Sequence, residues 1–294
     1  MKWGKMKLGV IFVNYNSGQY LKRCLDSLFF VLNGNDCDIL IIDNASKDAS
    51  VEYIRTHYPN LTVIKNKNNL GFASAVNMGI KTIKRDYILL LNPDSEILPQ
   101  SIDKMVGFME RTPDCGVLGG WVIYPDGRRQ ESCRRFPTFW RIVFGRRSSV
   151  FYRLFPNNRF SREYLLTDED LTKTKEVDFV AGSFMMLRKK ALDEVGLFDE
   201  DFFLYVEDAD LCLRMKKHGW KVFFYPEARC LHYHGETIRQ DNIRPEIYHA
   251  KSMYNFFKKH YHLNWLALLF LKTGVYLKAI QILSFGFAKR AFIR

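Results

Sequence analysis

Three clusters of polar residues in this chain have the types and spacing that chemistry needs. The first is Asn92-Pro93-Asp94, directly after an apolar run at 87–91. Mg²⁺ and Mn²⁺ take few protein oxygens and complete their shells with water and substrate phosphate, so Asp94 at a strand end suits such an ion. Asn-Pro-Asp is also a sequence that strongly favours a turn. Spacing alone does not decide between a metal site and an ordinary turn.

The second cluster, Glu207-Asp208-Ala209-Asp210, places three carboxylates at the start of a helix predicted at 208–218. Acids in a first helical turn often do no more than cap the helix and complement its dipole. A carboxylate that faces a cleft is instead a general base, able to take a proton from an acceptor hydroxyl. Acids and aromatics alternate just before this cluster, which favours a binding surface over a simple cap.

The third cluster holds His232 and His234. Two histidines two positions apart lie on the same side of a strand and can ligate a metal ion. A single such histidine is more often a structural residue held by hydrogen bonds. We interpret one of the two as a ligand because Asp94 offers a second ligand.

The elements that must position these clusters are short apolar runs alternating with helical patterns. In the first third, strands are predicted at 8–13, 38–43, 61–65 and 87–91, and helices at 19–32, 48–57 and 73–84. Uniformly apolar strands separated by helices predict an α/β fold with a mainly parallel sheet flanked by helices. Later strands are predicted at 117–124, 177–187, 221–225 and 228–233.

Ligands of such sheets bind beyond the carboxyl ends of the strands, and the residues that follow the predicted strands are polar. After the first three strands they include Asn14, Asn16, Asp43, Asn44 and Asn69. The sequence has neither a G-x-G-x-x-G turn, which disfavours a dinucleotide-binding fold, nor a P-loop, which excludes the P-loop NTPases. A nucleotide bound here needs its diphosphate charge met by another group, and a metal ion held by carboxylates would meet it.

The net charge of +12, from 44 Lys and Arg against 32 Asp and Glu, is concentrated in two segments. Residues 127–162 carry +9, residues 272–294 carry +5, and the rest of the chain carries −2. Both segments also hold aromatic and apolar side chains, a composition typical of a membrane interface. For the C-terminal segment we favour an anionic membrane surface over a helix packed on the domain. The arginine segment is equally a loop over an anionic substrate, and no nucleic-acid-binding motif accompanies the charge.

The order of several motifs makes the chain resemble family 2 glycosyltransferases with the GT-A fold, in their bacterial rhamnosyltransferase-like branch. The matching runs lie between about residues 7 and 240. They are VNYNS at 13–17, IDNASKD at 42–48, NNLGFA at 68–73 with Asn77, LNPD at 91–94, VAGSF at 180–184, GLFDE at 196–200, FLYVEDADLCLR at 203–214, and His232 with Gly235 and Thr237.

The resemblance implies a role for particular residues. Asn14 and Asp43 would contact the nucleoside of a nucleotide-sugar, and Asn69 and Gly71 would lie close to it. Asp94 matches the last acid of the Asp-x-Asp metal motif, in which Asn92 replaces the first acid.

For the acceptor, Asp208 matches the general base of inverting members. For the metal, His232 fits the late metal-site histidine better than His234. Residues of second rank are Asn16, Asn44, Asn77, Asn92, Glu207, Asp210 and His234.

The resemblance implies an inverting transferase that depends on Mg²⁺ or Mn²⁺. We expect a GT-A domain at 1–240, in which 127–175 is a basic aromatic insert or acceptor-side loop, and a C-terminal helical segment at 241–294 on a membrane surface. The enzyme would move a hexose, best L-rhamnose from dTDP-rhamnose, onto a bacterial surface polysaccharide or a polyprenyl-diphosphate-linked acceptor. It would work in the cytoplasm, peripherally on the inner face of the cell membrane.

Two alternatives stay open on the sequence alone. A galactosyl- or N-acetylglucosaminyltransferase that uses a UDP-sugar would look much the same. A non-catalytic protein that binds lipid or nucleic acid through the basic segments would need none of Asp94, Asp208 and His232, and its binding would not need Mg²⁺ or Mn²⁺.

Overall fold

The alternating apolar runs of the first third fold into four strands and three helices, as predicted. A computed structural model describes residues 8–146, 149–233 and 245–274. Its first elements are β1 (Leu8–Asn14), α1 (Gly18–Leu32), β2 (Cys37–Asp43), α2 (Ser50–His57), β3 (Thr62–Lys65), α3 (Phe72–Thr82) and β4 (Tyr87–Leu91).

The middle of the chain continues the sheet and then leaves it for the arginine-rich segment. The elements are β5 (Ser95–Ile97), α4 (Ser101–Arg111), β6 (Cys115–Ile123), β7 (Cys133–Arg134), the π-helical turn η1 (Arg141–Gly145), α5 (Val150–Leu154) and α6 (Arg159–Leu165).

The last part returns to the sheet and ends in helices. The elements are β8 (Lys175–Glu176), β9 (Phe179–Val180), β10 (Phe184–Arg188), α7 (Lys189–Val195), α8 (Glu207–Lys217), β11 (Lys221–His232) and α10 (Pro245–His260). Residues 265–274 are also helical.

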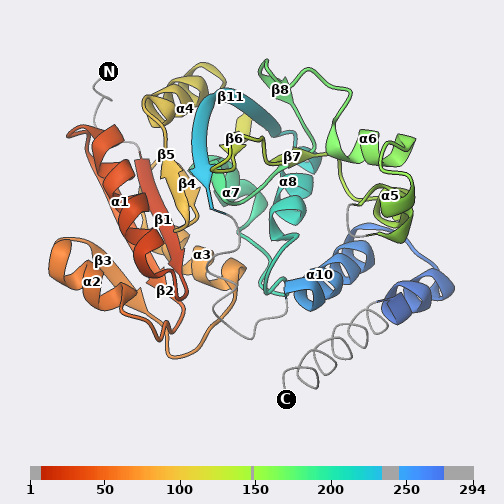
Figure 1. Cartoon of the computed structure of the whole chain (residues 1–294), viewed down its shortest axis with the longest axis horizontal. Coiled ribbons are helices and arrows are strands. Elements are labelled where there is room, and N and C mark those ends of the chain that lie inside the picture. Colours follow the sequence, from red (N-terminus) through yellow and green to blue (C-terminus); the bar gives the residue numbers. More distant parts are fainter. Residues whose placement is uncertain (1–7, 147–148, 234–244, 275–294) are drawn as a thin grey trace.

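The main sheet has the order β3-β2-β1-β4-β10-β6-β11-β5, and β8 pairs with β11 (Figure 1). Strands β1 to β4 are mutually parallel, as the alternation with helices predicts. Beyond them the sheet is mixed, because β10 runs antiparallel to both of its neighbours, β4 and β6. The polar ends of β1, β2 and β4 therefore meet at one edge of the sheet.

Two predicted strand boundaries were wrong. The run predicted at 177–187 is divided into β9 and β10 by Ala181-Gly182-Ser183, which turns toward α8. The two strands predicted at 221–225 and 228–233 form one strand, β11, whose register shifts between Tyr225 and Arg229. Pro226 lies within that irregularity, and a proline has no N–H to give to the strand ladder.

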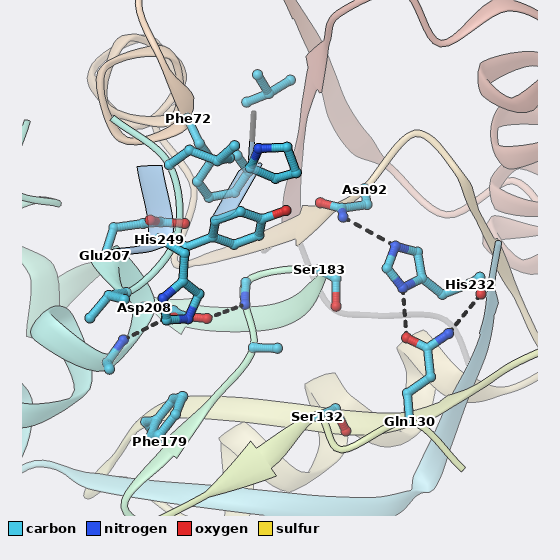
Figure 2. A pocket seen from close by; sticks show the side chains of 18 of the residues that line it. Phe72, Asn92, Gln130, Ser132, Phe179, Ser183, Glu207, Asp208, His232 and His249 are labelled. Atoms are coloured by element: carbon cyan, nitrogen blue, oxygen red, sulfur yellow. Dashed lines mark hydrogen bonds between the residues drawn. The ribbon is translucent and has the colours of Figure 1, made fainter. Parts of the chain in front are cut away.

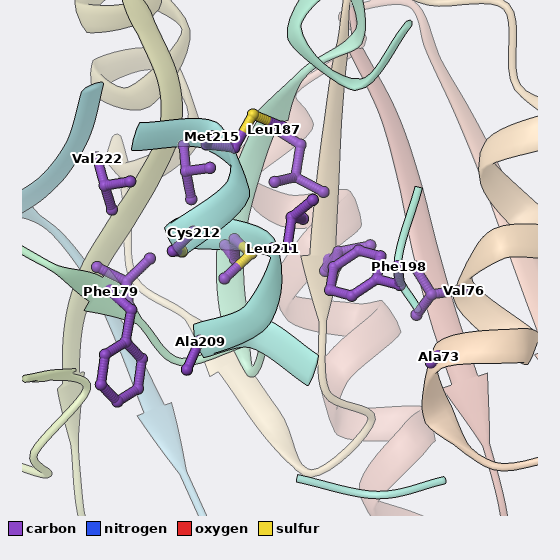
Figure 3. Packing of buried hydrophobic residues seen from close by; sticks show 14 of the residues in the cluster. Ala73, Val76, Phe179, Leu187, Phe198, Ala209, Leu211, Cys212, Met215 and Val222 are labelled. Carbon is purple, nitrogen blue, oxygen red and sulfur yellow. The ribbon is translucent and has the colours of Figure 1, made fainter. Parts of the chain in front are cut away.

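The two faces of the sheet bury separate hydrophobic clusters. Helices α1, α2 and α4 cover one face with side chains such as Leu25 and Met105. Helices α3, α7, α8 and α10 cover the other face, where Val76, Leu211 and Met215 lie in one cluster (Figure 3). The sheet is thus covered by helices on both sides.

Helix α10 packs into the core of the sheet domain. Met253, Phe256 and Phe257 are buried in the same cluster as α8. An ion network reinforces this contact: Asp210 accepts a hydrogen bond from Arg214 at 2.9 Å and lies 2.8 Å from Lys259 Nζ.

Asp210 also contacts His260 Nε2 at 2.7 Å and is itself fully buried. Burial alone would raise the pKa of Asp210, but the hydrogen bond from His260 and the charges of Arg214 and Lys259 lower it to about 2. A carboxylate held in this way stabilises the docking of α10 on α8.

We expect Asp210→Asn to lower the free energy of unfolding by about 3 kcal/mol at neutral pH, because it removes the buried carboxylate that pairs with Arg214 and Lys259. The pKa is lower in the folded state, so this contribution is complete above the ordinary aspartate range and is lost as the pH falls toward about 2. Denaturant unfolding at several pH values measures it. Asp193→Asn, at an exposed pair with Lys189, is the matched control and should change stability by less than about 0.5 kcal/mol. Equal effects of the two substitutions would contradict the structural role of Asp210.

Residues 261–270, which lead into the second basic segment, contact the first basic segment (Figure 1). Tyr261 donates a hydrogen bond to the carbonyl of Pro137 at 2.7 Å, and the rings of Phe139 and Phe270 are 5.9 Å apart. Among the described residues, no helix combines the length and apolarity needed to cross a membrane. His234 and residues 275–294 lie outside the described residues.

Candidate active site

The polar ends of the strands open into a pocket of about 620 Å³. Of the residues singled out from the sequence, eight line it: Asn44, Asn69, Gly71, Asn92, Asp94, Glu207, Asp208 and His232. Figure 2 shows Glu207 and Asp208 on one side of the pocket and His232 on the other. The structure therefore brings all three chemical clusters of the sequence into one cavity.

Asn14 and Asp43 lie beneath this pocket and do not line it. Both are fully buried, and Asn14 Nδ2 donates to Asp43 Oδ1 at 2.8 Å. The same amide group lies within hydrogen-bond distance of the hydroxyls of Ser46 and Ser50. These bonds tie the end of β1 to the turn after β2. Their contact with a nucleoside stays a prediction.

Asn16 belongs to the same framework, since its Oδ1 accepts from the backbone N–H of Lys47 at 2.7 Å. Asn77 is also structural. It donates to the Phe198 carbonyl and to Glu200 Oε1, at 2.8 and 2.9 Å, and so holds the segment before α8 against α3.

Gly71 joins the part of the pocket at the ends of β2 and β3 to the loop before α8. Asn44 Nδ2 donates to the Gly71 carbonyl at 2.9 Å, and Asn69 Oδ1 accepts from the Gly71 N–H at the same distance. Gly71 has φ +85°, and a Cβ there would lie 2.5 Å from the carbonyl oxygen of Phe203. Only glycine allows this approach, which lets Phe72 N–H bond to the same oxygen at 2.8 Å.

His232 is oriented by Gln130, a residue that the sequence did not single out. Gln130 Nε2 donates to the His232 backbone carbonyl at 2.7 Å, which turns Gln130 Oε1 toward His232 Nδ1 at 2.8 Å. An amide oxygen only accepts hydrogen bonds, so Nδ1 carries the proton. In the neutral ring, Nε2 then presents a lone pair to the pocket, as a metal ligand requires.

Asp94 faces that lone pair. Its Oδ1 is buried, lies 3.1 Å from His232 Nε2, and forms no hydrogen bond with any described residue. The side-chain nitrogen of Asn92 lies 3.3 Å from the same Nε2. Two lone pairs at 3.1 Å repel each other unless a proton or a cation lies between them. Asp94 and His232 therefore form a pair suited to a cation.

Asp208 lies at the other side of the pocket, in the first turn of α8. Its carboxylate accepts hydrogen bonds from the backbone N–H groups of Gly182 and Ala209, at 3.2 and 2.7 Å. Burial raises the pKa of Asp208 above that of an ordinary aspartate. A half-buried carboxylate with a raised pKa is a stronger base than an exposed one, which suits it to accept a proton from a bound hydroxyl.

Glu207 shares this end of α8 but is more deeply buried, with 5% of its surface exposed. Burial and the neighbouring charge of Asp208 raise its pKa well above the usual glutamate range. The loop that delivers both acids is strained, since Tyr205 and Val206 have φ of 67° and 70°. Positive φ at a β-branched residue is a genuine outlier of the kind that collects at functional sites.

The family model described as glycosyl transferase family 2 matches residues 9–196, which covers most of the first and middle parts of the chain. The chain belongs to this family. The matched range of this glycosyltransferase includes Asp94 and ends before Asp208 and His232.

Curated relatives extend the match to most of the chain. The N-acetylglucosaminyl-diphospho-decaprenol L-rhamnosyltransferase of Mycobacterium tuberculosis H37Rv is 31% identical over 274 residues, 89% of this chain and 87% of that protein. Rhamnosyltransferase WbbL of Escherichia coli K12 is 26% identical, over 84% of this chain and 91% of its own length. The glycosyltransferase is thus rhamnosyltransferase-like in sequence.

Solved structures confirm the GT-A fold. A mannosyltransferase from Pyrobaculum calidifontis in complex with GDP-Man and Mn²⁺ superposes with a TM-score of 0.58 at 14% identity, covering 93% of this chain and 71% of that one. S. aureus TarS 1-349 in complex with UDP-GlcNAc gives 0.57 at 16% identity, covering 90% and 69%.

A divalent metal fits the donor set of this glycosyltransferase. Within the described part of the chain, no cluster of three or more His, Cys, Asp or Glu side chains forms a complete metal cage. The pair Asp94 and His232 instead leaves most coordination positions to a substrate diphosphate and water, as Mg²⁺ and Mn²⁺ prefer. The orphaned Asp94 Oδ1 is the observation that supports this fit.

Proposed function

We propose that this enzyme transfers L-rhamnose from dTDP-rhamnose, with inversion, to an N-acetylglucosamine carried on a polyprenyl diphosphate. The observation that supports this proposal is that Asp208 lies across one pocket from Asp94 and His232. The sugar and the acceptor follow the printed activities of the relatives, which include an L-rhamnosyltransferase acting on N-acetylglucosaminyl-diphospho-decaprenol.

On the donor side, Asp94 and His232 would hold Mg²⁺ or Mn²⁺, and Gln130 keeps His232 in the ligand tautomer. When bound, the ion neutralises the charge that develops on the leaving diphosphate. Asn44, Asn69 and Gly71 line the part of the pocket nearest the ends of β2 and β3, where the nucleoside would lie. Asn14 and Asp43 hold the floor of that region in place.

On the acceptor side, Asp208 takes the proton from the sugar hydroxyl that attacks the anomeric carbon. The N–H groups of Gly182 and Ala209 hold its carboxylate in a fixed orientation during that step. Attack comes from the face opposite the diphosphate, so the configuration inverts. Proton removal by a positioned base of this kind contributes roughly 10²–10⁴-fold in rate.

Thermal stabilisation by nucleotides tests the donor assignment. With Mn²⁺ or Mg²⁺ present, dTDP should raise the melting temperature more than UDP or GDP does, and a chelator should remove the difference. A radiolabelled dTDP-rhamnose assay with a short-chain prenyl-diphospho-N-acetylglucosamine then detects transfer. Selective stabilisation by UDP would favour a UDP-sugar transferase. An unchanged melting temperature with all three nucleotides would favour a non-catalytic binding protein.

We also propose that the enzyme docks peripherally on the anionic inner face of the cell membrane. An apolar patch supports this. It consists of large side chains, 47–70% exposed, on the first basic segment and on the helix at 265–274 that contacts it, namely Trp140, Phe151, Leu154, Phe155, Trp265, Leu266, Leu269 and Phe270. Aromatic and aliphatic side chains beside cations suit the headgroup region.

Sedimentation with phosphatidylglycerol vesicles tests this docking. Trp265→Ser should weaken co-sedimentation, whereas Phe30→Ser, a control that is 73% exposed on α1 and distant in sequence, should not. Equal binding of the two variants would argue against the patch as the docking surface.

A further inference from the structure

Most of the arginines in the segment 127–162 that the structure describes are neutralised by nearby carboxylates. The ion pairs are Arg128–Asp126, Arg135–Glu169, Arg135–Asp178, Arg141–Glu163, Arg159–Glu163 and Arg162–Asp168. Two of the described arginines outside this set lie at the active site. Arg134 and Arg146 line the active-site pocket, and neither forms an ion pair with a described residue.

The surroundings of these two arginines differ. Burial alone would lower the pKa of Arg134, but nearby Tyr164 and the charges of Glu131 and Asp208 raise it. The Arg134 guanidinium lies over the ring of Tyr164, with its central carbon 5.8 Å from the ring centroid. Its Nε atom is buried and meets no acceptor among the described residues. Burial lowers the pKa of the Arg146 guanidinium, and the charge of Arg134 lowers it further. Two cations that repel each other in a half-buried pocket are stabilised by a bound anion.

Carboxylates also face this part of the pocket. Glu131 and Glu246 line it, and their charges act on Arg134 and Arg146 respectively. The buried Nε–H of Arg134 keeps a hydrogen bond for a ligand, and the guanidinium fork matches phosphate oxygens.

The position of Arg134 and Arg146 in the pocket indicates whether they face the donor diphosphate or a phosphate of the acceptor. Arg134 is in β7, which pairs with β9, the strand just before Gly182. Burial raises the pKa of Asp208, and the charge of Arg134 partly opposes this, so the arginine lies within electrostatic reach of the base. The donor diphosphate belongs at the other side of the pocket, with Asp94 and His232.

We propose that Arg134 and Arg146 bind the diphosphate that joins the acceptor sugar to its lipid. This assignment rests on the proposed transfer to a lipid-linked glycan and names the residues that select it. The acceptor sugar would then lie between Asp208 and the arginines. Its prenyl chain would leave the pocket beside η1 and α5, toward the apolar patch that holds Trp140 and Phe151.

Acceptor kinetics with two substrates test the proposal. One is a short-chain prenyl-diphospho-N-acetylglucosamine, and the other is an alkyl N-acetylglucosaminide of equal chain length without phosphate. Arg134→Gln and Arg146→Gln should each raise the KM for the diphosphate acceptor roughly 10- to 100-fold, as the loss of charged hydrogen bonds does. The KM for dTDP-rhamnose and that for the alkyl glycoside should stay unchanged. Lysine variants, which keep the charge and lose the fork, should be intermediate.

Arg162→Gln is the matched control, because it removes an arginine of the same segment that pairs with Asp168 at the surface. It should leave all three KM values unchanged. Equal losses on both acceptors would overturn the proposal, and so would a rise confined to the KM for dTDP-rhamnose. The second result would assign the arginines to the donor diphosphate.

Calorimetric titration of the prenyl-diphospho sugar without donor separates this inference from the proposed function. Weaker binding to Arg134→Gln and Arg146→Gln than to wild type and Arg162→Gln would support the anion site even if dTDP-rhamnose were not a donor. Equal binding to all four proteins would refute the anion site even if transfer occurred.

Discussion

Asp208→Asn is expected to reduce the rate of sugar transfer by roughly 10²–10⁴-fold and to leave nucleotide-sugar binding nearly intact. The amide fills the same space as the carboxylate and can still accept a hydrogen bond from Gly182 or Ala209. It cannot take a proton from the acceptor. Single-turnover kinetics at saturating donor, together with calorimetric titration of dTDP-rhamnose, separate the two effects.

The pH dependence of the wild type gives a second readout of the same residue. The base works in its ionised form, and burial raises the pKa of Asp208. The value of kcat/KM should therefore fall with decreasing pH while still above the range in which an exposed aspartate titrates. Asp208→Asn should lose this acidic limb along with most of the activity.

Asp201→Asn is the control for Asp208, because it removes an exposed carboxylate from the segment that leads into α8. It should keep near-normal turnover and the acidic limb. Near-normal turnover of Asp208→Asn would exclude Asp208 as the base and would direct attention to Glu207, the other carboxylate at this end of α8.

The sequence could predict the first half of the fold because its signals are local. Each of β1 to β4 is an apolar run bounded by polar residues, and parallel pairing follows from the helices between them. The insertion of β10 between β4 and β6 depends on contacts far apart in the chain. No local pattern reports such a pairing, so the mixed half of the sheet could not be derived.

Residue type identified the acids of the site but not the direction in which each one points. Asp208 and Asp210 are two positions apart on one helix, which turns by about 100° per residue, so they lie on nearly opposite faces. One faces the pocket and the other faces Lys259 of α10. That division was available from helical geometry. In contrast, Gln130 reaches His232 across 102 residues, and nothing in its neighbourhood marks it.

The structure also changes how the net charge of the arginine segment is interpreted. The net charge of +9 counts only residues 127–162, and several acids that pair with its arginines lie just outside this range. Asp126 lies just before the segment, and Glu163, Asp168 and Glu169 lie just after it, yet all four pair with its arginines. What distinguishes the segment is therefore the arginines left facing the pocket, a property that composition alone cannot show.

Asp94→Asn should lower activity roughly 100-fold or more at a fixed concentration of Mn²⁺, because it removes the anionic member of the metal pair that we propose. The residual activity should need more Mn²⁺. Electron paramagnetic resonance of Mn²⁺ in the presence of dTDP measures binding without turnover and should show the same weakening. Glu96→Gln is the control, since Glu96 lies two residues away and accepts a hydrogen bond from Tyr233 outside the pocket. Unchanged Mn²⁺ binding in Asp94→Asn would refute the site.

Gln130→Met tests the orientation of His232 separately from its presence as a proposed metal ligand. The variant keeps Asp94 and His232 but removes the acceptor that holds the proton on His232 Nδ1. Loss of such an outer partner typically costs 10–100-fold in metal affinity, so Gln130→Met should fall between wild type and Asp94→Asn. Wild-type affinity in Gln130→Met, with a clear loss in Asp94→Asn, would keep the metal at Asp94 and remove His232 from its coordination.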